Sequence, residues 1–199
     1  MIKSISFDQT EILENIIALH CAHYIDADVT YSKGNFYKKL PRPEWCSDLA
    51  PQFDFVRQAD CRNLPVENES FNTVILDGPF SVGSGKSLLV KKKGQNITPG
   101  RFGVFRTGKL LTEFYEQSIP EMYRILKPGG ILIQKIQPVV ACSKQWLNHF
   151  VSIKAALAAG FTFKDEFVLL AKQRPISGKI KKQQHARKFH SYFYVFKKC

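Results

Sequence analysis

Residues 71–80 read FNTVILDGPF, and this stretch decides the fold because a strand runs directly into a turn. Its first six residues form a short apolar run of aromatic and β-branched side chains, which predicts a buried β-strand. Asp77 ends the run, and Gly78 and Pro79 are residue types that favour turns. The stretch therefore places a carboxylate at the carboxyl end of a buried strand, just before the aromatic Phe80.

Strand and helix patterns alternate on both sides of this stretch. Further strands are predicted near 23–28, 53–59, 131–136, 161–171 and 191–196. Helical spacing is found within 1–22, at 35–40, over 110–126 and over 143–159. Residues 127–130, KPGG, predict a stop and a turn. This alternation predicts a single α/β domain over 1–199, with a mostly parallel sheet, helices on both faces and a closing antiparallel edge pair.

Composition excludes several classes of protein. The chain has 199 residues, 44% of them hydrophobic, which is enough to bury a core and excludes a wholly disordered chain. Its apolar runs are shorter than the roughly 18 residues of a spanning helix, so we expect no membrane partner. Five cysteines without a C-x-x-C pair argue against a disulfide framework and a structural metal site. We expect a cytoplasmic, reducing compartment.

The net charge of +12 comes from two segments that contain no acidic residue. Residues 81–109 hold seven basic side chains and residues 172–199 hold nine, whereas the remainder is mildly acidic. This distribution favours a polyanionic partner, nucleic acid first, over two solvated charged loops. We expect a basic active-site loop over 81–107 and a basic connection over 172–190. The candidate nucleic-acid contacts are Lys86, Lys91, Lys92, Lys93, Arg101, Arg106 and Arg187.

Acidic residues recur at the carboxyl ends of the predicted strands: Asp28, Asp48, Asp60 and Asp77. Ligands of open α/β sheets bind beyond these ends. A single aspartate in a turn is common without any function, but four in succession predict a ligand site at this edge. For Asp48 the choice stays open, because Glu44 and Asp54 lie close by in the sequence.

With these motifs, residues 23–196 resemble the class I S-adenosylmethionine-dependent methyltransferases, particularly those that methylate exocyclic amino groups of nucleic-acid bases. Residues 28–36 are similar to the family's loop around the methionine part of the cofactor, and 77–80 to its catalytic tetrapeptide. Residues 123–130 resemble a further family segment, and 190–196 the closing strand of some phage and bacterial DNA methylases. The resemblance implies a Rossmann-like methyltransferase fold with a seven-stranded sheet.

The resemblance also implies a cofactor, S-adenosylmethionine, and residues that bind it. Asp28 would lie at the methionine part, Asp48 would hold the ribose hydroxyls and Asp60 the adenine amine. The full set of cofactor-binding residues would be Asp28, Thr30, Tyr31, Gly34, Asn35, Asp48, Asp60 and Cys61.

The resemblance places the catalytic residues at Asp77, Gly78, Pro79 and Phe80. The Asp77 carboxylate and the Gly78 carbonyl would accept the hydrogens of the target amine. Phe80 would stack on a base rotated out of its duplex, with Pro79 fixing the turn. The substrate implied is adenine or cytosine, in DNA ahead of RNA.

Two positions depart from the family's pattern. The first motif has one glycine, Gly34, where two or three are usual, and Gly78 stands where the tetrapeptide usually has its first proline. Glycine is the most permissive residue, so the rigidity of proline is lost there. Two alternatives therefore stand beside a DNA amino-methyltransferase: an RNA base methyltransferase, and a catalytically decayed nucleic-acid-binding protein on the same fold.

Overall fold

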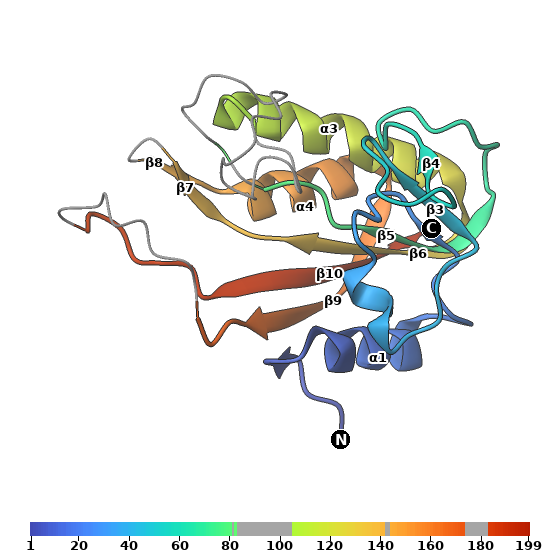
Figure 1. Ribbon diagram of the computed structural model, residues 1–199, viewed down its shortest axis with the longest axis horizontal. Helices are drawn as coiled ribbons and strands as arrows, with labels where there is room; N and C mark the ends of the chain where they lie inside the picture. Colours follow the sequence, from blue (N-terminus) through green and yellow to red (C-terminus); the bar gives the residue numbers. More distant parts are fainter. Residues whose placement is uncertain (81, 83–104, 142–143, 174–182) are drawn as a thin grey trace.

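The computed structural model describes residues 1–80, 82, 105–141, 144–173 and 183–199. The strands of its main sheet are β1 (Ile5–Ser6), β2 (Ala27–Asp28), β3 (Trp45–Asp48), β4 (Arg57–Gln58), β5 (Phe71–Leu76), β6 (Leu126–Ile136), β9 (Phe161–Leu170) and β10 (His190–Lys198). Within these residues they form an eight-stranded sheet in the order β1-β9-β10-β6-β5-β2-β3-β4 (Figure 1). Among these eight strands, β10 alone runs antiparallel to both of its neighbours.

The expected edge pair is corrected in one respect. Strands β9 and β10 do pair antiparallel, but β10 lies inside the sheet, between β9 and β6. Its residues are apolar on both faces: Phe193 and Val195 enter one core cluster, and Tyr194 and Phe196 the other. A strand that buries both faces belongs in the interior of a sheet. The eighth strand is β1, a two-residue addition outside β9 that the expected count of seven omitted.

Helices cover both faces of the sheet, as expected. Helix α1 (Gln9–His20) lies on one face, and α3 (Gly108–Ile125) and α4 (Asn148–Ala159) lie on the other (Figure 1). Successive residues of a strand point to opposite faces, so Leu76 packs in the cluster of α3 and α4, whereas Ile75 packs in the cluster of α1. Strand β5 is therefore buried on both sides, in agreement with its sequence pattern.

Two expected helices are shorter than predicted. The segment expected to be helical over 143–159 begins with part of a hairpin, β7 (Val139–Ala141) and β8 (Lys144–Trp146), and α4 starts only at Asn148. Residues expected to open a helix at 35–40 form one short 3-10 helix, η1 (Asn35–Lys38). The connections between β2, β3 and β4 are thus compact.

The predicted helix stop before KPGG, residues 127–130, is confirmed, because α3 ends at Ile125, but the stretch itself lies within β6. Phe71 pairs with Leu126 and Thr73 with Ile131, so two steps along β5 correspond to five along β6. Gly129 takes a φ of +78°, which glycine adopts without steric cost. The turn signal is real, but it produces a bulge rather than a chain reversal.

Candidate functional site

The predicted acidic residues meet at one edge of the sheet. Asp28 ends β2, Asp48 ends β3, and Asp77 directly follows β5. These three strands are adjacent and parallel, in the order β5-β2-β3, so their carboxyl ends lie side by side. Asp60 follows the next strand, β4.

Thr30 connects Asp28 to Asp77. The Asp28 Oδ1 accepts a hydrogen bond from the Thr30 amide at 2.9 Å, and its Oδ2 accepts one from the Tyr37 hydroxyl at 2.9 Å. The Thr30 Oγ1 in turn accepts a hydrogen bond from the Asp77 amide at 2.7 Å. The loop after β2 and the turn after β5 are thereby held in one arrangement.

Asp28 is an unusual carboxyl group, because its side chain is almost completely buried, at 1% exposure. Burial raises the pKa of Asp28 to about 7, and the nearby charges of Asp77 and Asp48 add to the rise. The hydrogen bonds from Thr30 and Tyr37 oppose it. Its hydrogen-bond donors in the described part of the chain, Thr30 and Tyr37, are uncharged.

Asp48 fixes the same loop from the neighbouring strand. Its Oδ2 accepts a hydrogen bond from the Ser32 amide at 2.9 Å, and its Oδ1 one from the Ala50 amide at 2.8 Å. Each carboxylate oxygen has two lone pairs, so Asp48 keeps acceptor capacity for a ligand. Of the three acids considered for this position, the structure puts Asp48 at the strand end.

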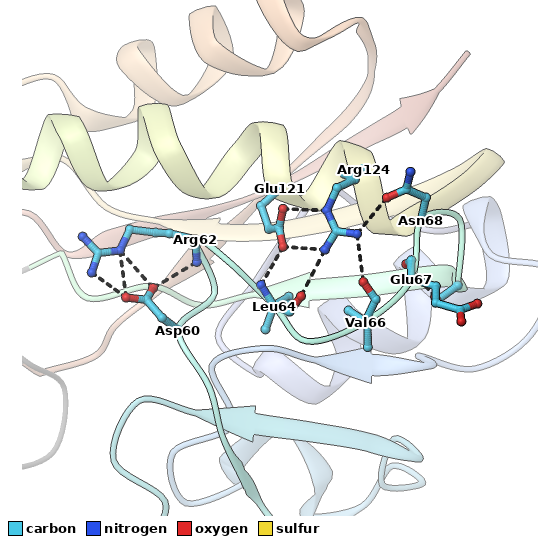
Figure 2. A network of polar contacts seen from close by, with 9 residues as sticks. Asp60, Arg62, Leu64, Val66, Glu67, Asn68, Glu121 and Arg124 are labelled. Atoms are coloured by element: carbon cyan, nitrogen blue, oxygen red, sulfur yellow. Dashed lines mark hydrogen bonds and ion pairs between the residues drawn. The ribbon is translucent and has the colours of Figure 1, made fainter.

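Asp60 is oriented toward a partner that the sequence reasoning did not identify (Figure 2). The Arg62 Nε lies 2.9 Å from Asp60 Oδ1 and 3.1 Å from Oδ2, and the Arg62 amide also donates to Oδ1. The arginine side chain lowers the pKa of Asp60. Cys61 is buried, and burial raises the pKa of its thiol to about 12. Asp60 is therefore committed to an ion pair, and Cys61 to the core.

The loop at residues 28–36 has a glycine at position 34, where the Tyr31 ring leaves no space for a side chain. Gly34 has a φ of +62°, and a Cβ there would lie 2.4 Å from the Tyr31 hydroxyl oxygen. The Tyr31 ring stacks on Tyr37, with centroids 5.5 Å apart. Asn35 opens η1, and its carbonyl accepts a hydrogen bond from Gln9 on α1. The loop is thus packed by aromatic side chains instead of further glycines.

The turn after β5 also has a structural reason for its glycine. A Cβ at Gly78 would lie 2.6 Å from the Phe114 Cε1 on α3. Phe114 is itself only 7% exposed and packs against Phe105. Pro79 and Phe80, which follow Gly78, are half-buried. The departure from the family's proline therefore coincides with a close helix contact.

A lysine contacts Asp77, and the sequence reasoning missed it. Lys135 Nζ on β6 lies 3.4 Å from the Asp77 Oδ2, and the two side chains are 15% and 23% exposed. Burial raises the pKa of Asp77, whereas the lysine lowers it. One signal was available: Lys135 is the one charged residue in the predicted strand 131–136.

Of the seven predicted nucleic-acid contacts, two lie in the described part of the chain. Arg106 and Arg187 are exposed, as a phosphate contact requires. Within the described ranges no group of His, Cys, Asp or Glu is suited to a metal ion, and no helix is long and apolar enough to cross a membrane. The other candidates, Lys86, Lys91, Lys92, Lys93 and Arg101, lie outside the described residues.

Comparison with known proteins yields no match to any family model or curated protein. Among solved structures, TrmN from Thermus thermophilus matches with a TM-score of 0.55 and 15% identity, over 98% of this chain and 50% of that one. The chain has a Rossmann-like methyltransferase fold. It spans about half the length of TrmN, so the likeness shows the methyltransferase fold and nothing further.

Two further solved structures match with TM-scores below 0.5. A SAM-dependent methyltransferase from Thermotoga maritima is 16% identical over 86% of this chain and 80% of its own, with a TM-score of 0.47. A Thermus thermophilus protein provisionally assigned as a DNA modification methylase, solved with S-adenosyl-L-methionine, is 14% identical over 70% of this chain and 53% of its own, with a TM-score of 0.44.

Proposed function

We propose that the protein is an S-adenosylmethionine-dependent methyltransferase that acts on the exocyclic amino nitrogen of adenine or cytosine in DNA. The observation that carries this proposal is the pair Asp28 and Asp77, joined through Thr30 at the carboxyl edge of a methyltransferase-fold sheet. The resemblance of residues 77–80 and 190–196 to amino-methylating DNA enzymes supports the target, and the two basic segments support a nucleic acid.

The residues present fit this cofactor at two of three positions. S-adenosylmethionine supplies a methyl group on a positively charged sulfur. Asp28, buried and without a charged donor among the described residues, suits such a cation, and Asp48 retains acceptor capacity for hydroxyl groups. Asp60 fits less well, because an adenine amine would have to displace Arg62 from it.

The chain's contribution to the chemistry is positioning. An exocyclic amine is a poor nucleophile, because its lone pair is delocalised into the ring. The Asp77 carboxylate and the Gly78 carbonyl accept hydrogen bonds from the two N–H groups of this amine. These hydrogen bonds favour a lone pair that is localised on the nitrogen. S-adenosylmethionine would supply the methyl group in exchange for one N–H proton, which would leave to solvent, while Asp77 and Gly78 would hold the amine nitrogen in place. Phe80 stacks on the extruded base.

The test is transfer of a labelled methyl group to DNA, RNA and protein pools, followed by nucleoside analysis. We expect label in N6-methyladenine or N4-methylcytosine of DNA. Asp77→Ala should lower the rate by on the order of 100-fold. It should still be stabilised thermally by S-adenosylhomocysteine, which reports cofactor binding separately.

A matched control is Asp54→Ala, which removes an exposed carboxylate near the same edge and should keep the wild-type rate. Label only in RNA would move the proposal to the RNA alternative. Absence of both label and stabilisation by S-adenosylhomocysteine would instead support the decayed nucleic-acid-binding protein. Undiminished transfer by Asp77→Ala would remove Asp77 from the site.

A further inference from the structure

The register of the sheet puts a lysine opposite Asp77. Leu76 pairs with Gln134 on β6, so the next residues, Asp77 and Lys135, face each other across the strands. Lys135 also pairs with Phe193 of β10 on its other side. A lysine at this position is in the interior of the sheet, next to the candidate catalytic turn.

The ammonium group of Lys135 is held from four elements. It lies 3.4 Å from the Asp77 Oδ2 and 3.5 Å from the Gln9 Oε1 on α1. It also lies 5.0 Å from the centre of the Phe36 ring on η1 and 5.6 Å from that of Phe193. Both distances are within the range of cation–π attraction. Such a setting fixes the place of a long side chain that is usually mobile at a surface.

A lysine on the face of the sheet that α1 covers costs free energy of hydration. The rest of the face is the apolar cluster of α1, which includes Ile75 and Ile133, and an ammonium group loses hydration there. Among the described residues, the titratable groups that interact electrostatically with Asp77 are Lys135 from β6, Asp28 from β2 and the Tyr115 phenol from α3. Of these, Lys135 is the cation.

We propose that Lys135 is a positioning residue for the methyl-transfer site: its contact with Oδ2 anchors the Asp77 carboxylate, so that Oδ1 is presented to the target amine. In the described residues, Lys135 is the side chain that donates to this carboxylate. Asp28 is thereby left as the partner of the cationic cofactor. This inference rests on the proposed function, but one of its tests does not.

The decisive experiment replaces Lys135 by methionine, which keeps the length of the side chain and removes its charge. The pKa of Asp77 should then rise, because burial raises it and the opposing cation is gone. The rate of single-turnover methyl transfer should then fall at acidic pH. The acidic limb of the plot of rate against pH should shift to higher pH by about one pH unit or more. At a fixed pH on that limb the rate falls about tenfold per unit.

Lys135→Arg keeps the charge and should restore the wild-type profile, and Lys164→Met, an exposed lysine on β9, should leave it unchanged. In an Asp77→Asn background, Lys135→Met should no longer move the profile, because the group that titrates is absent. Cofactor affinity should change less than about threefold, because in the described residues the carboxylate that Lys135 contacts is that of Asp77 and not that of Asp28 or Asp48.

A second readout needs no activity. Titration of aspartate carboxyl ¹³C signals, assigned with Asp77→Asn, should give a higher pKa for Asp77 in Lys135→Met than in the wild type. Equal pKa values and equal pH profiles in the two proteins would overturn the inference. If Lys135→Met does not fold, Lys135→Gln gives the same comparison. A wild type that methylates nothing would refute the proposed function, while the titration would still decide the role of Lys135.

Discussion

The packing around Gly78 explains why a glycine stands where the resembling tetrapeptides usually have a proline. Its missing side chain leaves space for the Phe114 ring, and a Cβ would approach that ring to 2.6 Å. Real Cβ contacts are longer, so any larger residue must displace the ring or the turn. The loss of the proline is therefore explained by contact with α3 and need not indicate a decayed enzyme.

We expect Gly78→Ala to lower the free energy of unfolding by about 1–3 kcal/mol, the usual cost of overpacking. The cause is the Phe114 ring, so Phe114→Leu should reduce the cost when the two changes are combined. Urea unfolding of both single variants and the double variant measures this coupling. Additive effects would show that the clash does not determine the choice of glycine.

Helix α3 is held against residues 64–68 by hydrogen bonds from Glu121 and Arg124, which form an ion pair in its last turns (Figure 2). Glu121 accepts hydrogen bonds from Arg124 and from the Leu64 amide, at 2.6 Å for the latter. Arg124 donates to the carbonyls of Leu64 and Val66 and to the Asn68 side chain. This network anchors the segment between the Asp60 turn and β5. Arg124 thus has a structural role in the described residues.

Glu121→Ala should destabilise the protein by about 2 kcal/mol, because it leaves a buried amide and an arginine without their acceptor. Arg124→Lys should not preserve stability, since one ammonium cannot reproduce the planar set of donors. The comparison is Lys109→Ala, which breaks the exposed Lys109–Glu113 pair on the same helix and should cost less than about 0.5 kcal/mol. Chemical denaturation separates the two cases, and equal costs would contradict the buried role of Glu121.

The whole molecule divides its charge between a mildly acidic body and two basic segments. The acids that meet at the carboxyl edge of the sheet belong to the body, whereas most of the excess lysines lie in residues 81–109 and 172–199. Such a division favours a cationic ligand in the site and a polyanion beside it. It also predicts that the two binding functions respond differently to mutation.

Changing Lys91, Lys92 and Lys93 together to alanine should weaken nucleic-acid binding and flatten its salt dependence, with the slope reduced by about 0.9 for each phosphate that is no longer neutralised. Affinity for S-adenosylhomocysteine should stay the same. Binding titrations between low and moderate salt measure both. Replacing the exposed lysines Lys3, Lys154 and Lys164 controls for net charge alone, and an equal weakening in this control would contradict a localised interface.

Much of this arrangement could be predicted from local sequence. The strand at 71–76 is present at the predicted residues, because a short run of β-branched and aromatic side chains favours a strand in any buried setting. The acids follow their strands because a turn must begin where the apolar run ends. Parallel strands then bring those ends together, so the edge that holds Asp28, Asp48 and Asp77 was predictable in outline.

Only the tertiary structure decided which side chains meet there. Asp77 and Lys135 are 58 positions apart and become partners through the register of β5 and β6, which also depends on the bulge at residues 127–130. The interior place of β10 follows from packing on two faces, and the glycine at 78 from the approach of Phe114. Periodicity along a chain specifies local conformation, whereas partners distant in sequence are selected by packing, register and charge in three dimensions.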